Sequence, residues 1–162
     1  MRQQYAPLII TVTTDGRTGD QFITQMAGRA ATTICHDARQ LLMSNQFIPS
    51  NGITYNLAII RGDEFRPSQR TNRHIEAVAT GLGYLKPPMT VAPLLREKLP
   101  DNVLKRMNLL AIVVMHPPII WDDSPSFLGI RRSPHQGHLL CAYHCGLNFR
   151  WYNNYGFAYL VL

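Results

Sequence analysis

Residues 116–125 combine the side chains most typical of a hydrolytic site. His116 follows an apolar run, and Trp121 precedes two carboxylates, Asp122 and Asp123. An imidazole and a carboxylate can serve as general acid and base, and an indole can form a platform for a substrate. A proline-rich hairpin loop with a solvated acidic tip explains the same residues, and we prefer that interpretation. His116, Asp122 and Asp123 are kept as candidate catalytic residues of a small hydrolase.

Four residues near the C-terminus have the side chains that bind zinc: His138, Cys141, His144 and Cys145. Side chains alternate along a strand, so the histidines are expected on one face and the cysteines on the other. At ~3.3 Å per residue, Cys141 and Cys145 would lie about 13 Å apart. Such a strand alone forms neither a tetrahedral zinc site nor a disulfide. We therefore predict no metal and no cofactor.

The three cysteines are predicted to be buried and structural. An odd number argues against a disulfide framework and for a reducing compartment, which favours the cytoplasm. A helix N-terminus lowers the pKa of a thiol, but Cys35 is expected in the middle of a helix, away from that end. Cys141 and Cys145 are expected on the strand face opposite their nearest histidines, so neither thiol has a base beside it.

The turn over residues 15–20, DGRTGD, joins a strand to a helix, as a phosphate-binding loop does. It lacks the Gly-Lys-Ser/Thr ending of a P-loop, and a carboxylate stands at each end of it. Asp20 is expected to cap the helix with its own side chain. The turn is therefore predicted to be a helix cap and not an anion site.

Two groups of basic residues could contact phosphates. In the first group, Arg66, Arg70 and Arg73 are spaced four and three residues apart, so they would share one face of a helix. A row of this kind can contact a nucleic-acid backbone. An ordinary solvated helix face is the simpler explanation.

The second group lies in the C-terminal third, where no acidic residue follows Asp123. It interleaves basic and aromatic side chains, namely Arg131, Arg132, His135, Arg150, Trp151 and Tyr152. Single-stranded nucleic acid needs this combination, because cations contact phosphates and aromatic rings stack on bases. Alternation along a strand puts only half of these side chains on one face, and the aromatic residues that face inward would form core instead.

The pattern of apolar residues predicts the elements that hold these groups. Apolar residues recur every three or four positions over 20–43 and again from about 67 to 82, which predicts two helices. Two shorter helices are expected at 91–99 and 101–107, separated by Pro100. Strands are predicted at 5–14, 53–60, 109–115, 127–130, 138–145, 149–152 and 157–162.

This order of elements predicts a single α+β domain over residues 1–162. We expect one mixed, mostly antiparallel sheet with helices packed on one face and a C-terminal β-meander. A length of 162 residues is typical of one domain, and the sequence contains no internal repeat.

The chain has a formal net charge of +6, which favours association with acidic partners, nucleic acid among them. The longest apolar run, residues 109–115, is far shorter than the ~20 residues that a membrane helix needs, so no membrane contact is expected. The apolar segment 157–162 must be central in the sheet, covered, or paired with a second subunit. Because charged residues make up only 16% of the chain, we predict a homodimer.

Three functions are therefore open. The leading hypothesis is a non-enzymatic binding or adaptor protein that engages an acidic partner such as single-stranded nucleic acid. The first alternative is a small hydrolase that uses His116 and the Asp122/Asp123 loop. The second is a structural subunit of a homo-oligomer.

Overall fold

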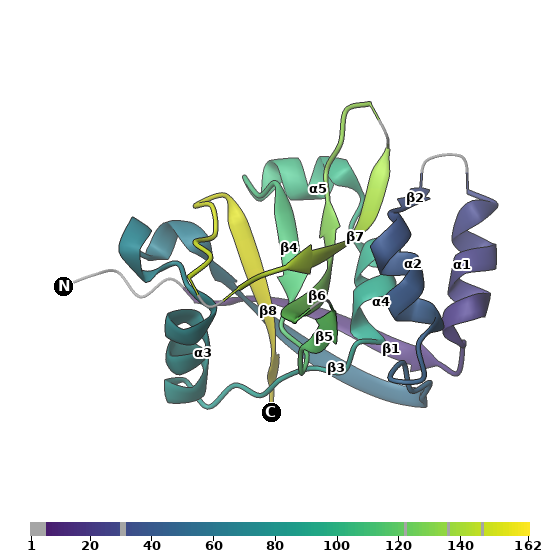
Figure 1. Ribbon diagram of the computed structural model, residues 1–162, viewed down its shortest axis with the longest axis horizontal. Coiled ribbons are helices and arrows are strands. Elements are labelled where there is room, and N and C mark those ends of the chain that lie inside the picture. The colour runs from purple at the N-terminus through teal and green to yellow at the C-terminus, as the bar shows by residue number, and fades with distance from the viewer. Residues whose placement is uncertain (1–5, 30–31, 122, 136, 147) are drawn as a thin grey trace.

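The computed structural model describes residues 6–29, 32–121, 123–135, 137–146 and 148–162. Within these ranges the chain forms one eight-stranded sheet and five α-helices (Figure 1). The strands are β1 (Leu8–Asp15), β2 (Thr32–Ile34), β3 (Asn51–Arg61), β4 (Ala111–Val114), β5 (Ile119–Trp121), β6 (Ser124–Arg131), β7 (His138–His144) and β8 (Tyr155–Val161). The helices are α1 (Gly19–Ala27), α2 (His36–Met43), α3 (Asn72–Gly81), α4 (Val91–Lys98) and α5 (Asp101–Arg106), with the 3-10 turns η1 (Gly62–Glu64) and η2 (Pro67–Gln69).

The sheet has the strand order β1-β3-β8-β4-β6-β7-β2, with β5 paired to β6. Most neighbouring strands are antiparallel, while β4–β8 and β2–β7 are parallel pairs. The predicted α+β class with a mixed, mostly antiparallel sheet is confirmed. Strands β4, β6 and β7 follow one another as an antiparallel run, but β8 leaves that run and inserts between β3 and β4. This central position explains why β8 is so apolar, because both of its faces are buried.

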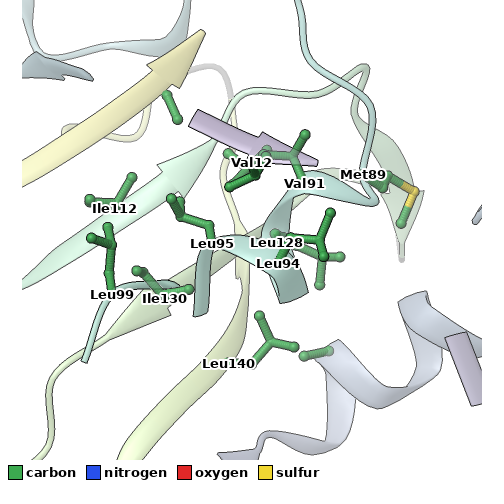
Figure 2. Close-up of a cluster of buried hydrophobic side chains, with 14 of the residues drawn as sticks. Val12, Met89, Val91, Leu94, Leu95, Leu99, Ile112, Leu128, Ile130 and Leu140 are labelled. Carbon is green, nitrogen blue, oxygen red and sulfur yellow. The ribbon is translucent and has the colours of Figure 1, made fainter. Parts of the chain in front are cut away.

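The larger core lies between one face of the sheet and helices α1, α2 and α4, which share that side of the molecule (Figure 1). Residues 91–96 of helix α4 are all buried, among them Val91, Leu94 and Leu95. Figure 2 shows these residues among side chains of β4, β6 and β7. Leu128 and Ile130 reach this core from alternate positions of β6, as the period of a strand requires.

The smaller core lies on the opposite face of the sheet, beneath α3 and the coil that precedes β8 (Figure 1). Ile75 and Ala79 are one turn apart on α3, and both are fully buried or nearly so. They belong to the same cluster as Phe157 and Tyr159 of β8. The coil contributes Trp151 to this cluster.

The single helix predicted over residues 20–43 is wrong. Helix α1 ends at Ala27, β2 pairs with β7, and α2 begins after Cys35. The apolar residues of both helices face the same core, so the helical spacing continues across the break. The β-branched residues Thr32–Ile34 favour a strand and pair with the edge of β7.

Other predictions have mixed outcomes. The helices expected at 91–99 and 101–107 are confirmed as α4 and α5. Residues 149–152 form coil and not a strand, and the loop expected over 116–125 contains β5 and the start of β6. The helix expected from residue 67 is split into η2 and α3. In the described ranges, no helix has the length and apolar content needed to cross a membrane.

Candidate functional site

Trp151 is the anchor of the C-terminal coil and belongs to the core. Its side chain is only 2% exposed, and its indole Nε1 donates to Asn72 Oδ1 at 2.7 Å. Its ring packs against Phe149 and Phe157, with centroids 4.9 and 5.5 Å away. Trp151 therefore has no face open for a base, and the prediction that it contacts a partner is wrong.

The same coil lies beside the segment between β3 and α3, although the two are distant in sequence (Figure 1). The Trp151 amide donates to the Arg70 carbonyl at 2.8 Å. Gly62 packs so closely against the coil that a Cβ there would lie 2.6 Å from the carbonyl oxygen of Tyr152. The fold thus brings the coil that carries Arg150 and Tyr152 beside the segment that carries the first basic group.

The three arginines of the first group do not share one helix face, contrary to the prediction. Arg66 precedes η2, Arg70 follows it, and Arg73 lies in the first turn of α3. The Arg70 guanidinium donates to the carbonyls of Gly62 and Phe65 at 3.0 and 3.1 Å, so it holds the loop in place. Arg66 and Arg73 are exposed to solvent.

The second group is divided by the strand register. Arg131, at the end of β6, is exposed and lies in one row with Ala111 and Tyr155, on the sheet face that carries the coil. Arg132 donates from Nε to the Leu109 carbonyl at 2.7 Å, which gives it a structural role. His135 is exposed in the β6–β7 connection.

We give the name basic face to the exposed arginines of both groups together with the exposed aromatic residues of the coil. It consists of Arg66, Arg73, Arg131 and Arg150, with the aromatic residues Phe149 and Tyr152. Tyr152 is 64% exposed and Phe149 is 38% exposed. Within the described part of the chain, none of the four arginine side chains forms a salt bridge or a hydrogen bond. Their charge is therefore available to a partner.

His116 is unsuited to act as a general base. It is fully buried, its Nε2 accepts the Leu128 amide at 2.9 Å, and its Nδ1 donates to the Pro117 carbonyl at 2.7 Å. Burial lowers the pKa of His116 to about 4, so the ring is neutral. Asp123 is exposed at φ 62° in the β5–β6 turn, and Asp122 lies outside the described residues. Both ring nitrogens of this candidate catalytic histidine are thus used by the backbone.

The turn before α1 is a helix cap, as predicted, although the capping residue is Thr18 and not Asp20. The Thr18 hydroxyl accepts the Gln21 amide at 3.2 Å, and the Gln21 side chain accepts the Thr18 amide at 2.9 Å. Arg17 forms ion pairs with Asp15 and Glu97 at 2.9 and 2.7 Å. Its charge is already neutralised, which speaks against an anion site.

A polar relay that the sequence did not predict joins α2 to β6 and β7. Ser126 Oγ lies 2.6 Å from His144 Nδ1, and His144 Nε2 lies 2.8 Å from Asp37 Oδ2. The order of groups resembles that of a serine nucleophile, a base and an orienting carboxylate. Ser126 is completely buried, however, so a substrate cannot reach its hydroxyl in this conformation. The relay ties the first turn of α2 to the sheet.

Cys35 and Cys141 form a second link at the same junction, with their Sγ atoms 2.8 Å apart. The prediction that Cys35 lies mid-helix is wrong, since it is the N-cap residue of α2. The hydrogen bond from Cys141 lowers the pKa of Cys35 to about 7. Among the described residues, no three His, Cys, Asp or Glu side chains gather as metal ligands would.

Two hollows over the described residues are small or open, and residues 116–125 line neither of them. One leaves no space for a water molecule and is lined by Thr14, Asp15, Arg17, Phe22, Ser50, Thr90 and Leu94. The other is a depression of about 380 Å³ lined by Asp20, Gln21, Thr24 and Gln25. Substrate pockets are usually enclosed and apolar with a few polar groups, which describes neither hollow.

Comparison with protein-family models, with curated proteins and with solved structures finds no match.

Proposed function

We propose that this protein is a non-enzymatic binding protein whose basic face engages an acidic partner, and that the partner is single-stranded nucleic acid. The observation that carries the proposal is the basic face itself. Four arginines are exposed and form no ion pair among the described residues, and two exposed aromatic residues, Phe149 and Tyr152, flank Arg150 closely in the coil. Guanidinium groups bind phosphates, and the rings of Tyr152 and Phe149 can stack on bases.

The arrangement of this face fits a flexible strand better than a compact substrate. The arginines border the coil and the end of β6, so no deep pocket is needed to reach them. Arg131 lies in one row with Ala111 and Tyr155 of the smaller core, so it is on the sheet face opposite the larger core and its helices α1, α2 and α4. Local acidic groups are few: Asp63 is paired with Arg61, and burial raises the pKa of Glu64.

We also propose a cytoplasmic location, which the free thiols of the three cysteines support, since free thiols are usual in a reducing compartment. A homodimer stays a prediction, but β8 no longer supports it, since that strand is central in the sheet. The outer edge of β1 is the better candidate for pairing with a second copy. Light scattering at high micromolar concentration tests this, and a strict monomer would remove it.

The test of the proposed function is the salt dependence of binding to a fluorescent oligothymidylate, followed by anisotropy. Each phosphate contact on a single strand contributes about 0.7 to the slope of log K against log salt. Arg73→Ala and Arg150→Ala should each lower the slope by about 0.7, and the double variant by about 1.4. Arg39→Ala removes an exposed arginine of α2, outside the basic face, and should leave the slope unchanged.

Tyr152→Ala separates stacking from charge. It should weaken binding by about 1–3 kcal/mol per stacked base with the salt slope intact. Absence of any affinity at low salt for single-stranded DNA or RNA would end the nucleic-acid proposal. The proposal that the same arginines bind an acidic protein would then remain to be tested.

A further inference from the structure

The register of β2 and β7 places two cysteines side by side. Ile34 is opposite Leu140 in this parallel pair, and the Cys35 amide donates to the Leu140 carbonyl at 3.0 Å. The next residue on each strand is a cysteine, Cys35 on one and Cys141 on the other. Adjacent strands lie ~4.8 Å apart, which is within the range of Cα separations that a disulfide spans.

The two thiols differ in ways that suit different roles. Cys35 is partly exposed and stands at the N-terminus of α2, where the helix dipole favours a thiolate. The hydrogen bond from Cys141 is the largest influence on the pKa of Cys35 and lowers it to about 7, although burial opposes this effect. That hydrogen bond and burial together raise the pKa of Cys141, which is buried. Cys35 is thus the nucleophile and Cys141 the proton donor beside it.

Cys145 supplies an internal comparison. It is completely buried, and burial raises its pKa to about 12. It has no thiol partner among the described residues. Low reactivity is therefore expected of Cys145 under conditions in which Cys35 reacts.

We propose that Cys35 and Cys141 are a redox-active pair that exchanges with small disulfides of the glutathione type, with Cys35 as the attacking thiol and Cys141 as the resolving thiol. This inference does not rest on the proposed nucleic-acid binding. It assigns a reactive site to the junction of β2, α2 and β7, on the basis of two adjacent thiols whose sulfur atoms are already 2.8 Å apart.

The exchange takes place in two balanced steps. The Cys35 thiolate attacks one sulfur of the small disulfide, forms a mixed disulfide with it and releases the other half as a thiolate. Cys141 then loses its proton to that thiolate and attacks the Cys35 sulfur, and the second half leaves as a thiolate, which takes a proton from solvent. The net result is one Cys35–Cys141 disulfide and two reduced small thiols, so both electrons pass to the small disulfide.

Oxidation should leave the fold in place and make it more stable. The two sulfur atoms are in contact, so bond formation requires little movement of β2 or β7. The link joins residues 106 positions apart, and closing so large a loop restricts the unfolded chain. The oxidised protein should therefore melt at a higher temperature than the reduced protein.

The test exposes the reduced, full-length protein to defined mixtures of oxidised and reduced glutathione, followed by alkylation and peptide mapping. We expect one intramolecular Cys35–Cys141 disulfide, with Cys145 recovered in alkylated form after denaturation. Cys145→Ser is the matched control and should oxidise as the parent does. Cys141→Ser should stop at a mixed disulfide on Cys35, whereas Cys35→Ser should leave Cys141 unmodified.

A second measurement follows the alkylation rate of Cys35 against pH. Serine at position 141 can still donate a hydrogen bond and alanine cannot, so the midpoint should move upward from about 7 further in Cys141→Ala than in Cys141→Ser. A disulfide that contains Cys145, exclusively intermolecular disulfides, or three equally unreactive thiols in the folded parent would each overturn the proposal. The peptide map of the oxidised parent protein tests the Cys35–Cys141 pairing even where a variant fails to fold.

Discussion

Replacing Trp151 with alanine tests whether the C-terminal coil is held by the core or presented to a partner. The indole is 2% exposed and makes edge contacts with several rings, and its Nε1 hydrogen bond fixes the coil to α3 through Asn72. Removal of a buried tryptophan costs about 3–5 kcal/mol of unfolding free energy. Domains of this kind have only about 5–15 kcal/mol in total, so the loss is large.

For a domain of this length, each kcal/mol corresponds to about 2–4 °C in melting temperature, so Trp151→Ala should melt roughly 6–20 °C lower than the parent. The assay is thermal melting by circular dichroism, with urea unfolding as a second measure. Tyr152→Ala is the matched control, because Tyr152 is the next residue and is 64% exposed. A surface change of this kind should stay within about 0.5 kcal/mol.

Trp151→Phe divides the effect into its parts. Phenylalanine keeps an aromatic ring in the cluster but cannot donate to Asn72 Oδ1, so this variant should lose about 1–2 kcal/mol, mainly from the missing hydrogen bond and a small cavity. If Trp151→Ala melted within about 2 °C of the parent, the assignment of Trp151 to the core would be wrong, and its ring would again be a candidate for base stacking.

Two further predictions concern buried histidine and serine networks. The pKa of His116 is about 4 in the folded protein, against an ordinary value of 6.5. Between pH 6.5 and 4 this histidine is therefore protonated in the unfolded chain and neutral in the folded chain. The free energy of unfolding should fall by up to about 3 kcal/mol as the pH drops from 6.5 to 4. His116→Gln, whose amide oxygen can accept the Leu128 amide, should flatten this dependence in urea titrations at several pH values. Ser126→Ala should lower the free energy of unfolding by about 1 kcal/mol, because the hydrogen bond to His144 is lost. A fluorophosphonate probe should leave the native protein unlabelled. Labelling at Ser126 would contradict a structural role for the relay.

Much of the fold could be predicted from local patterns, and the errors have a common cause. Alternating apolar residues located most strands, and the short helices around Pro100 were found because proline separates them. The prediction of one helix over 20–43 is wrong because α1 and α2 pack against the same core, so their apolar residues continue the same three- and four-residue spacing. Only the pairing of β2 with β7, a contact between distant residues, reveals the break.

The site could be predicted only in part for the same reason. The sequence identified Arg66, Arg73, Arg131 and Arg150 by type, but it could not show which neighbouring basic residues turn inward. Arg70 and Arg132 bind backbone carbonyls and Trp151 is core, and these contacts depend on how the coil meets the loop after β3. The Ser126–His144–Asp37 relay likewise depends on the register of β6 and β7 and on the position of α2. Residue types alone carry no signal for it.

Arg131 connects the basic face with the thiol pair. Its backbone carbonyl accepts from the buried Arg96 at 3.2 Å, which fixes the end of β6, while its own side chain is exposed on the basic face. The Cys141 hydrogen bond is the largest influence on the pKa of Cys35, and the positive charge of Arg131 lowers that pKa further. A polyanion bound at the basic face would neutralise this charge and so favour the protonated thiol. The two proposals can fail separately, but if both hold, occupation of the basic face must make Cys35 a weaker nucleophile.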